Sequence, residues 1–284
     1  MADNLENEVA EHYGDADLLA RIDAGLKAGG ADPDNLTAED LAPVDEFHIG
    51  GREATRHTVS RMGLAASDHV LDVGCGIGGA ARYMAAEMGC RVAGIDLTPE
   101  FIDVARILTK RLGLSGAVTF ETASALAMPL KDAAFDAATS FHVAMNIAAR
   151  AALYGEMARV MRPGAVLGIY DVMKTGPGEI VYPVPWAETA ATSHVTSPEE
   201  MRALLAAAGF EVRESEDRRD FALQFFRRRL GAAADGAPPP LGIHLVMGET
   251  WREKFKNTLA NTEAGRIAPV QMIAVRKGGR GLAA

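Results

Sequence analysis

The pattern of apolar and polar positions changes along the chain and divides it into regions. Residues 1 to about 66 have a mostly helical pattern, with a Gly29-Gly30 break between helices. From Asp68 to Lys174, short apolar runs alternate with helical stretches, which favours a parallel sheet. The expected strands lie near 69–74, 91–96, 117–121, 135–141 and 165–173, and the expected helices near 78–88, 99–113 and 149–161, the last ended by Pro163-Gly164.

Two more strands are expected beyond Lys174. A helix near 197–208 begins with Ser197 as its capping residue and Pro198 in its first turn, and a short strand follows near 210–213. The last strand is expected over 267–275. An insertion over 216–265 separates these two strands, with expected helices near 219–230 and 242–261 and a flexible, Ala-, Gly- and Pro-rich stretch over 231–240.

The insertion is too long to be a simple connection. Loops of this length in a compact domain are usually functional or disordered, and two helices imply an ordered segment. Because ligands bind such sheets beyond the carboxyl ends of the strands, we expect a lid over that pocket. A dimer surface is the alternative.

A glycine-rich turn follows the first expected strand. The run Val70-Leu71-Asp72-Val73-Gly74-Cys75-Gly76-Ile77-Gly78-Gly79 is typical of a strand that ends in a nucleotide-binding turn before a helix. Its spacing fits both the dinucleotide pattern G-x-G-x-x-G and the tighter G-x-G-x-G. Asp72 helps to separate them, because a carboxylate repels a pyrophosphate and attracts a ligand with an ammonium and a sulfonium. A turn-capping role for Asp72 is the plainer alternative.

A second acidic residue lies where a ribose-binding group is expected. Asp96 ends the short strand near 91–96, roughly 20 positions beyond the glycine turn, and such an acid accepts hydrogen bonds from ribose hydroxyls. Thr98 and Pro99 then form a good helix start. In order and within one strand–helix–strand unit, the two signals reinforce each other.

From Asp68 to about Lys174 the chain resembles the class I S-adenosylmethionine-dependent methyltransferases. The first-turn motif falls on Asp72 to Gly78, and the ribose-binding acid falls on Asp96. Within that superfamily the chain is similar to small-molecule enzymes grouped around the sarcosine/dimethylglycine N-methyltransferases, with tocopherol and quinone C-methyltransferases more distant. That finer resemblance rests on Pro43-Val44-Asp45-Glu46-Phe47-His48, on His142 to Ile147 and on Tyr182-Pro183-Val184-Pro185-Trp186-Ala187.

The resemblance implies an α/β fold with a Rossmann-like, seven-stranded, mostly parallel sheet and flanking helices. We expect an N-terminal helical cap over 1–66, a core over 67–215 and 266–277, and a helical lid over 216–265. The implied cofactor is S-adenosyl-L-methionine. Its expected binding residues are Asp72, Gly74, Gly76, Gly78, Asp96, Leu97, Ser124, Ala125 and Phe141.

One position departs from the family pattern. Ser124 stands where the family often has an acid that receives the adenine amino group. A hydroxyl also accepts that hydrogen bond, but charge-assisted bonds are stronger, so the departure bears on cofactor affinity.

Methyl transfer is an in-line displacement that needs an aligned nucleophile with a free lone pair. His142 directly follows the fourth expected strand, where this fold places its reacting groups, and its ordinary pKa near 6.5 suits a general base. A role that only orients the substrate is equally open for it. Asn146 is the second expected catalytic residue. The expected substrate-binding residues are Tyr13, His48, Met145, Tyr170 and Trp186, of which Trp186 offers a face to a methylated ammonium or serves as a packing anchor.

Composition narrows the class of protein. The 284 residues are 48% hydrophobic, enough for a substantial core, yet no apolar run reaches the about 20 residues that span a bilayer. A formal net charge of −9 disfavours nucleic acid as a partner. Two cysteines, no signal-peptide pattern and no metal-ligand spacing predict a cytoplasmic protein without a metal site. A homodimer stays open.

The expected function is therefore methyl transfer to a small molecule, and the resemblance favours N-methylation of a sarcosine- or dimethylglycine-like amine. C- or O-methylation of a phenolic or quinone-type ring is the alternative, since a base at His142 serves it too. A more distant alternative is an NAD(P)-dependent oxidoreductase that uses the same glycine turn. A third is a binding module that keeps the fold without catalysis.

Overall fold

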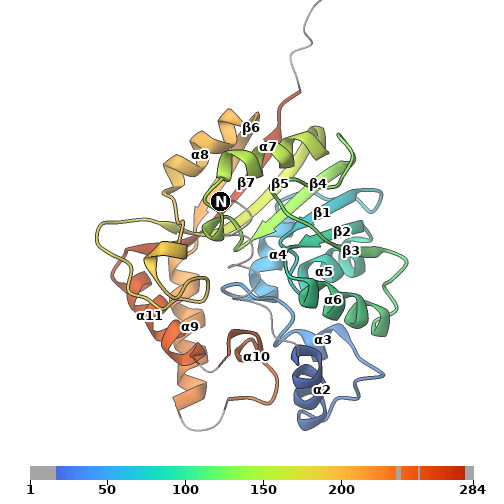
Figure 1. Ribbon diagram of the computed structural model, residues 1–284, viewed down its shortest axis with the longest axis vertical. Helices are drawn as coiled ribbons and strands as arrows, with labels where there is room; N and C mark the ends of the chain where they lie inside the picture. Colours follow the sequence, from blue (N-terminus) through green and yellow to red (C-terminus); the bar gives the residue numbers. More distant parts are fainter. Residues whose placement is uncertain (1–16, 235–237, 249, 279–284) are drawn as a thin grey trace, which may run out of the picture.

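One seven-stranded sheet organises the molecule (Figure 1). The computed structural model describes residues 17–234, 238–248 and 250–278. The strand order is β3-β2-β1-β4-β5-β7-β6, and only β7 runs antiparallel to its neighbours. The strands are β1 (His69–Val73), β2 (Arg91–Asp96), β3 (Val118–Thr122), β4 (Phe135–Phe141), β5 (Met161–Lys174), β6 (Phe210–Asp217) and β7 (Ile267–Arg276). This confirms the predicted Rossmann-like, mostly parallel sheet.

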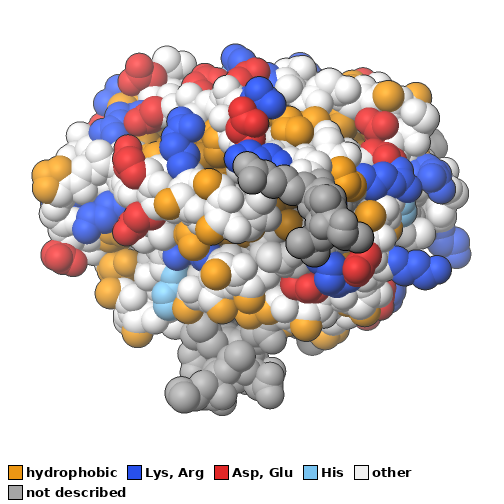
Figure 2. Space-filling view, turned by 90° about the horizontal axis from the view of Figure 1, so that it is seen from above, with side chains coloured by type: hydrophobic (Ala, Val, Ile, Leu, Met, Phe, Trp, Pro, Cys, Tyr) orange, Lys and Arg blue, Asp and Glu red, His pale blue; other side chains and the backbone are white. Residues whose placement is uncertain are grey.

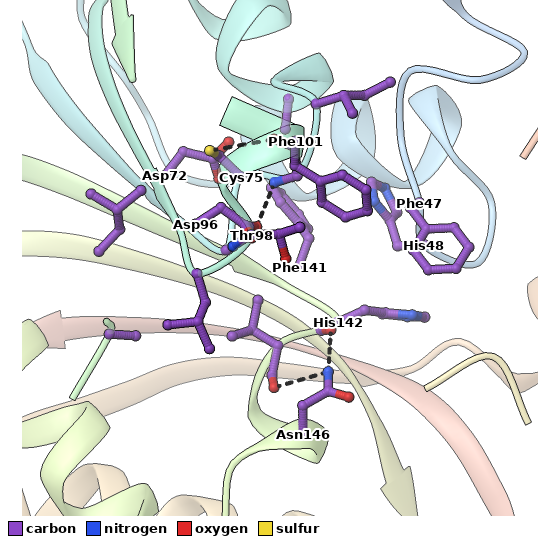
Figure 3. Close-up of a pocket in the computed structure, with 18 of the residues that line it drawn as sticks. Phe47, His48, Asp72, Cys75, Asp96, Thr98, Phe101, Phe141, His142 and Asn146 are labelled. Carbon is purple, nitrogen blue, oxygen red and sulfur yellow. Dashed lines mark hydrogen bonds between the residues drawn. The ribbon is translucent and has the colours of Figure 1, made fainter. Parts of the chain in front are cut away.

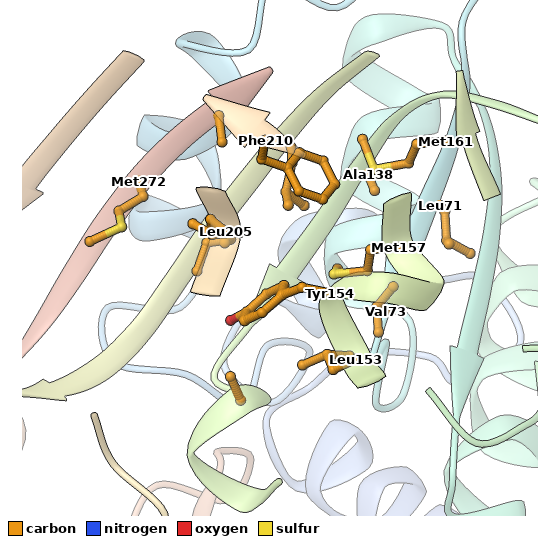
Figure 4. Packing of buried hydrophobic residues seen from close by; sticks show 14 of the residues in the cluster. Leu71, Val73, Ala138, Leu153, Tyr154, Met157, Met161, Leu205, Phe210 and Met272 are labelled. Atoms are coloured by element: carbon orange, nitrogen blue, oxygen red, sulfur yellow. The ribbon is translucent and has the colours of Figure 1, made fainter. Parts of the chain in front are cut away.

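Helices cover both faces of the sheet because alternate strand residues are apolar on both sides. Val70 of β1 faces a core built with α4 (Arg52–Ser60), α5 (Gly79–Met88) and α6 (Pro99–Arg111). The next residue, Leu71, faces the opposite core (Figure 4). The helices of that core are α7 (Arg150–Val160) and α8 (Pro198–Ala207), which contribute Leu153, Tyr154, Met157, Met201 and Leu205.

The remaining helices lie beyond the core and pack in two further clusters. In one, α2 (Leu18–Ala28) and α3 (Ala38–Leu41) share apolar contacts with α6 and with Leu241. In the other, α9 (Arg219–Ala234) and α11 (Trp251–Glu263) pack with Trp186 and with the one-turn helix α10 (His244–Met247). Because α10 also contacts α2, the N-terminal helices and the segment between β6 and β7 meet beyond the sheet's carboxyl edge (Figure 1).

Strand direction explains where the insertion lies. β7 is antiparallel to both β5 and β6, so β6 runs in the same direction as the parallel strands. The connection from Asp217 to Ile267 therefore begins and ends at the carboxyl edge, the side on which α9, α10 and α11 stand.

Several predicted boundaries were wrong. Helix α7 ends at Val160 and β5 begins at Met161, before Pro163, with a register shift that takes the proline out of the regular ladder. β6 continues to Asp217 because it is an edge strand, where charged residues are tolerated. The helix expected over 219–230 continues to Ala234, and the helix expected over 242–261 is two helices separated near Gly248.

The charge of the surface and the length of the helices relate to two expected absences, nucleic acid as a partner and a membrane span. Figure 2 shows acidic and basic side chains intermingled on the face that it presents. No helix in the described ranges is long and apolar enough to cross a membrane.

Candidate active site

A cavity of about 370 Å³ lies at the carboxyl ends of β1, β2 and β4 (Figure 3). Its size falls within the usual range for small-molecule sites, about 300–1,000 Å³. The cavity is lined by the strand ends and the loops after them, by the first turns of α5 and α6, by the 44–48 segment and by α10. The lining residues are Val44, Asp45, Glu46, Phe47, His48, Asp72, Gly74, Cys75, Gly76, Ile77, Ala80, Ile95, Asp96, Leu97, Thr98, Phe101, Ala123, Ala125, Leu126, Phe141, His142, Val143, Asn146, Ile147, Ala148, Ala149 and Val246.

The glycine turn takes a conformation that side chains rarely adopt. Gly74, Gly76 and Gly78 have φ of 70°, 53° and 88°. A Cβ on Gly74 would lie 2.3 Å from Val143, so the turn and the loop after β4 approach closely only because that atom is absent. Gly78, one of the predicted cofactor residues, does not line the cavity. It ends the turn before α5, packed against Phe120 and Arg82.

Asp72 is a buried carboxylate with an unused oxygen. Thr139 donates a hydrogen bond of 2.8 Å to Oδ1, whereas Oδ2 is buried and has no hydrogen-bond partner among the described residues. Burial raises the pKa of Asp72 to about 7, partly opposed by the bond from Thr139. A cationic group in the cavity would satisfy this oxygen and keep the carboxylate ionised.

Asp96 is held by the backbone that surrounds it. Its Oδ2 accepts the N–H of Gly76 and its Oδ1 accepts the N–H of Thr98, both at 2.9 Å. The carboxylate lines the cavity, where a ribose hydroxyl can compete for it as a hydrogen-bond donor. Leu97 and Ala125 line the cavity beside it, as Phe141 does.

These residues fit S-adenosylmethionine. An orphaned buried carboxylate suits its ammonium, a carboxylate that lines the cavity suits its ribose, and the apolar side chains suit its adenine. Ser124, expected near the adenine, does not line the cavity, and its hydroxyl accepts the N–H of Leu126 at 3.0 Å.

A buried ionic cluster closes the cavity on the N-terminal side, and sequence reasoning missed it. The carboxylate of Glu46 accepts hydrogen bonds from Arg52 and from Thr55, and that of Asp45 accepts one from Arg82. These charges lie far apart in sequence, so no local pattern pairs them. The sequence offered one signal of this contact, the glycine at position 79. A Cβ there would lie 2.1 Å from the carbonyl oxygen of Asp45.

Two histidines stand at the inner end of the cavity. His48 stacks on Phe141, with ring centroids 5.2 Å apart, and lies 5.9 Å from the ring of His142. Burial lowers the pKa of His48 to about 4 and that of His142 well below its ordinary value. Both imidazoles are therefore neutral at neutral pH.

A second, smaller cavity of about 40 Å³ shares Phe47, His48 and His142 with the first. Its other walls are apolar, and most come from the insertion and from the segment around Trp186. These other lining residues are Ile49, Met145, Pro185, Trp186, Phe225, Phe226, Ile243, Met247 and Phe255. The aromatic residues of the insertion had not been expected at the site.

The remaining predicted residues take different places. Asn146 lines the larger cavity, and its amide lies 3.4 Å from the backbone carbonyls of His142 and Val143. Tyr170 lines neither cavity; its ring stacks on His142, 5.3 Å between centroids. Trp186 donates its indole N–H to Ser193 at 2.9 Å and presents an apolar surface to the smaller cavity. Tyr13 lies outside the described residues.

Comparison with known proteins gives the family. Residues 71–169 match the family model described as a methyltransferase domain. The chain is 31% identical over 204 residues to an O-methyltransferase from Pyrenophora dematioidea, which covers 71% of this chain and 74% of that protein. It is also 31% identical over 189 residues to the O-methyltransferase resE from Aspergillus sclerotiorum, covering 64% and 69% of the two chains.

Solved structures share the fold at lower identity. The [4+2]-cyclase SpnF superposes with a TM-score of 0.71 at 23% identity, over 96% of this chain and 97% of that one. A geranyl diphosphate C-methyltransferase from Streptomyces coelicolor A3(2), in complex with Mg²⁺, geranyl-S-thiolodiphosphate and S-adenosyl-L-homocysteine, gives 0.69 at 18%, over 96% and 98%. A protein from Galdieria sulphuraria, described as a candidate sarcosine dimethylglycine methyltransferase, gives a TM-score of 0.66 at 18% identity, over 79% and 84% of the two chains.

The relationship to methyltransferases decides against the NAD(P)-dependent alternative, in agreement with the carboxylate that flanks the glycine turn. The orphaned oxygen of Asp72 gives the same answer from the geometry, because it favours a cationic ligand at this turn. The chain belongs to the class I S-adenosylmethionine-dependent methyltransferases that act on small molecules.

Proposed function

We propose that this methyltransferase transfers the methyl group to a hydroxyl oxygen of a lipophilic, phenol-like small molecule. The observation that carries the proposal is the lining of the smaller cavity. Its walls are aliphatic and aromatic except for the two neutral imidazoles of His48 and His142. A planar apolar ring suits such walls, and a hydroxyl group suits an imidazole lone pair.

The lining fits a sarcosine-like amine less well. An amino acid substrate carries a carboxylate and an ammonium, and burying them requires charged or strongly polar partners. No Asp, Glu, Lys or Arg is among the described residues that line the smaller cavity. The names of the curated relatives from Pyrenophora dematioidea and Aspergillus sclerotiorum agree with oxygen as the acceptor atom.

The larger cavity has the groups for the methyl donor. When bound there, S-adenosylmethionine supplies an electrophilic methyl group. Asp72 would hold its ammonium, Asp96 its ribose, and Phe141, Leu97 and Ala125 its apolar surfaces. His48 and His142 then stand between donor and acceptor, at the boundary that both cavities share.

A panel of acceptors with a methyl-labelled donor tests the function. The panel contains phenols, hydroquinones, sarcosine, dimethylglycine and aliphatic alcohols, and the methylated atom is identified by mass spectrometry and NMR. We expect O-methylated phenols. Turnover of the amines in the absence of phenol turnover would overturn the proposal, and C-methylated products would show that the acceptor atom is carbon.

Asp72→Asn serves as the matched control, because it removes only the charge next to the donor cavity. At donor concentrations below Kd, turnover should fall in this variant, and turnover that does not fall would mean that Asp72 does not hold the donor.

A further inference from the structure

O-methylation requires a destination for the hydroxyl proton, and two imidazoles reach the smaller cavity. His48 and His142 differ in what lies behind them. The Nε2 atom of His142 is buried and has no hydrogen-bond partner among the described residues. Its main chain is in the left-handed region, with φ of 57°, and its ring stacks on Tyr170. No carboxylate contacts the His142 ring in the described part of the chain.

A chain of buried hydrogen bonds stands behind His48. Its Nε2 atom lies 3.1 Å from the carbonyl oxygen of Gly51 and 3.1 Å from Oγ1 of Thr55. The hydroxyl of Thr55 donates its own hydrogen to Glu46, so its oxygen is left to accept. A backbone carbonyl also only accepts. Both neighbours therefore require the hydrogen of the His48 ring on Nε2, which leaves the lone pair on Nδ1.

These hydrogen bonds also place a negatively charged group near the His48 ring. Oε2 of Glu46 lies 3.5 Å from Nε2 of His48, and the side chains of both residues are almost completely buried. Arg52 and Thr55 fix that carboxylate by hydrogen bonds to its two oxygens. A positive charge formed on His48 would thus face a carboxylate held in place, although burial and, less strongly, the Arg52 guanidinium paired with that carboxylate lower the pKa of His48. Among the described residues, no ion pair places a carboxylate against the His142 ring.

Resting on the proposed function, we propose that His48, rather than His142, accepts the proton of the acceptor hydroxyl, with Thr55 and Glu46 as positioning residues. A lone pair of the acceptor oxygen forms the new O–C bond while the pair of the C–S bond passes to sulfur. The O–H proton moves to Nδ1 of His48, and the imidazolium later releases it to water. Atoms and charges balance without a further reactant.

The lowered pKa of His48 is compatible with this step. Burial keeps the imidazole neutral before reaction, so the lone pair is free. An oxygen that is gaining a methyl group becomes strongly acidic, so even a weakly basic imidazole accepts its proton.

The tautomer of His48 is testable without an acceptor. Long-range ¹H–¹⁵N NMR of histidine-labelled protein, saturated with S-adenosylhomocysteine, distinguishes the two neutral tautomers, and His48→Gln assigns the signal. We expect the hydrogen on Nε2. A hydrogen on Nδ1 would overturn the proposal and would leave the proposed O-methylation untouched.

Kinetics with an acceptor from the panel test the role in catalysis. We expect His48→Gln to lower kcat about 100-fold or more, since a general base contributes roughly 10²–10⁴-fold. Its affinity for S-adenosylhomocysteine, measured by calorimetry, should stay close to that of the parent protein. His142→Gln should lower kcat less. The reverse order of the two histidine variants would overturn the proposal.

Thr55 has a matched control on the same helix. Thr55→Val removes the hydroxyl that links Glu46 to His48, and Thr58→Val removes an equally buried hydroxyl that donates to Gln271. We expect a lower kcat for Thr55→Val alone, with KM unchanged and activity restored by Thr55→Ser. Equal losses in the two valine variants would mean that Thr55 acts only through packing and would refute its role.

Discussion

At the residue scale, the donor side of the site depends on Asp72, a buried carboxylate with one oxygen that no described residue satisfies. Asp72 was predictable because it lies within a local motif, two positions before a glycine. Glu46 and Thr55 were not, because their partners become neighbours only when the 44–60 region folds over the start of α5. Local sequence therefore identified the donor side of the site and left the groups behind His48 unassigned.

Replacing Asp72 should change the stability of the fold and the affinity for the cofactor product in opposite directions. Its pKa is about 7 in the folded protein, against about 3.9 in an unfolded chain, so the folded state binds this proton more tightly. The fold thus loses stability as the pH rises from about 4 to 7 and does not regain it above. We expect Asp72→Asn to raise the melting temperature of the ligand-free protein at pH 8 but not at pH 4.

The same variant should bind the cofactor product more weakly. Loss of a charge-assisted bond should lower the affinity for S-adenosylhomocysteine about 10- to 100-fold at pH 8. Thermal unfolding with and without ligand measures both effects. Undiminished affinity would show that Asp72 does not hold the ammonium.

Release of the Asp72 proton on binding also predicts a pH dependence of the affinity. Below about pH 7 the carboxyl is protonated in the empty protein and must lose its proton when the ammonium binds. Affinity for S-adenosylhomocysteine should therefore rise about tenfold per pH unit between pH 5 and 7 and then level off. Calorimetry in buffers of different ionisation enthalpy should register one released proton, and Asp72→Asn should abolish the slope.

At the element scale, helix ends marked by local residues were predicted correctly, whereas boundaries that depend on the surrounding fold were not. The Ser197 cap and the Gly209 end of α8 are as expected, because both act within one helical turn. The polar end of β6 was missed since only its edge position makes it acceptable in a strand. Gly248 lies where the helix expected over 242–261 is interrupted, with φ of 74°, a conformation that only the fold reveals.

The junction between the 44–48 segment and α5 should depend on Gly79. A Cβ there would lie 2.1 Å from the carbonyl oxygen of Asp45 and 2.6 Å from Cγ of Glu46. We expect Gly79→Ala to destabilise the protein by about 1–3 kcal/mol in urea titrations, as overpacking does. Gly155→Ala in α7 is the matched control, because a Cβ there meets nothing within 4 Å. It should stabilise by about 0.5–1 kcal/mol.

Helix α10 should influence the two cavities through adjacent residues. Val246 lines the larger cavity and Met247 the smaller one. We expect Val246→Trp to weaken binding of S-adenosylhomocysteine, and Met247→Trp to leave that binding close to normal while it blocks acceptor turnover. If both variants weakened the binding of S-adenosylhomocysteine equally, the two residues would not serve separate cavities.

At the scale of the whole molecule, the seven-stranded, mostly parallel sheet was predictable, whereas the way the flanking segments meet was not. Alternating strands and helices suffice for the sheet. α2 contacts α10 and also the segment before it, where a Cβ on Gly25 would lie 2.5 Å from the carbonyl oxygen of Pro240. These contacts join segments more than two hundred residues apart. No pattern within either segment encodes that contact.

We propose that the insertion acts as a lid. The smaller cavity, about 40 Å³, holds only about three water molecules, so a phenolic acceptor enters only if the aromatic side chains of α9 and α11 move. S-adenosylhomocysteine at 100 times its Kd should stabilise the fold by about 2.7 kcal/mol and slow tryptic cleavage after Arg227, Arg228 and Arg229.

Mass spectrometry of the fragments checks this prediction. Cleavage of the insertion at the same rate with and without ligand would contradict a lid coupled to the donor site. The alternative, a dimer surface, predicts protection that grows with protein concentration instead.

The antiparallel last strand has an evolutionary consequence. Since both ends of the 218–266 connection return to the sheet at one edge, that segment can be lengthened, shortened or replaced without disturbing the strands that hold the donor. New acceptor preferences can thus arise by exchange of a single contiguous stretch of gene, while the chemistry of the methyl source is inherited unchanged.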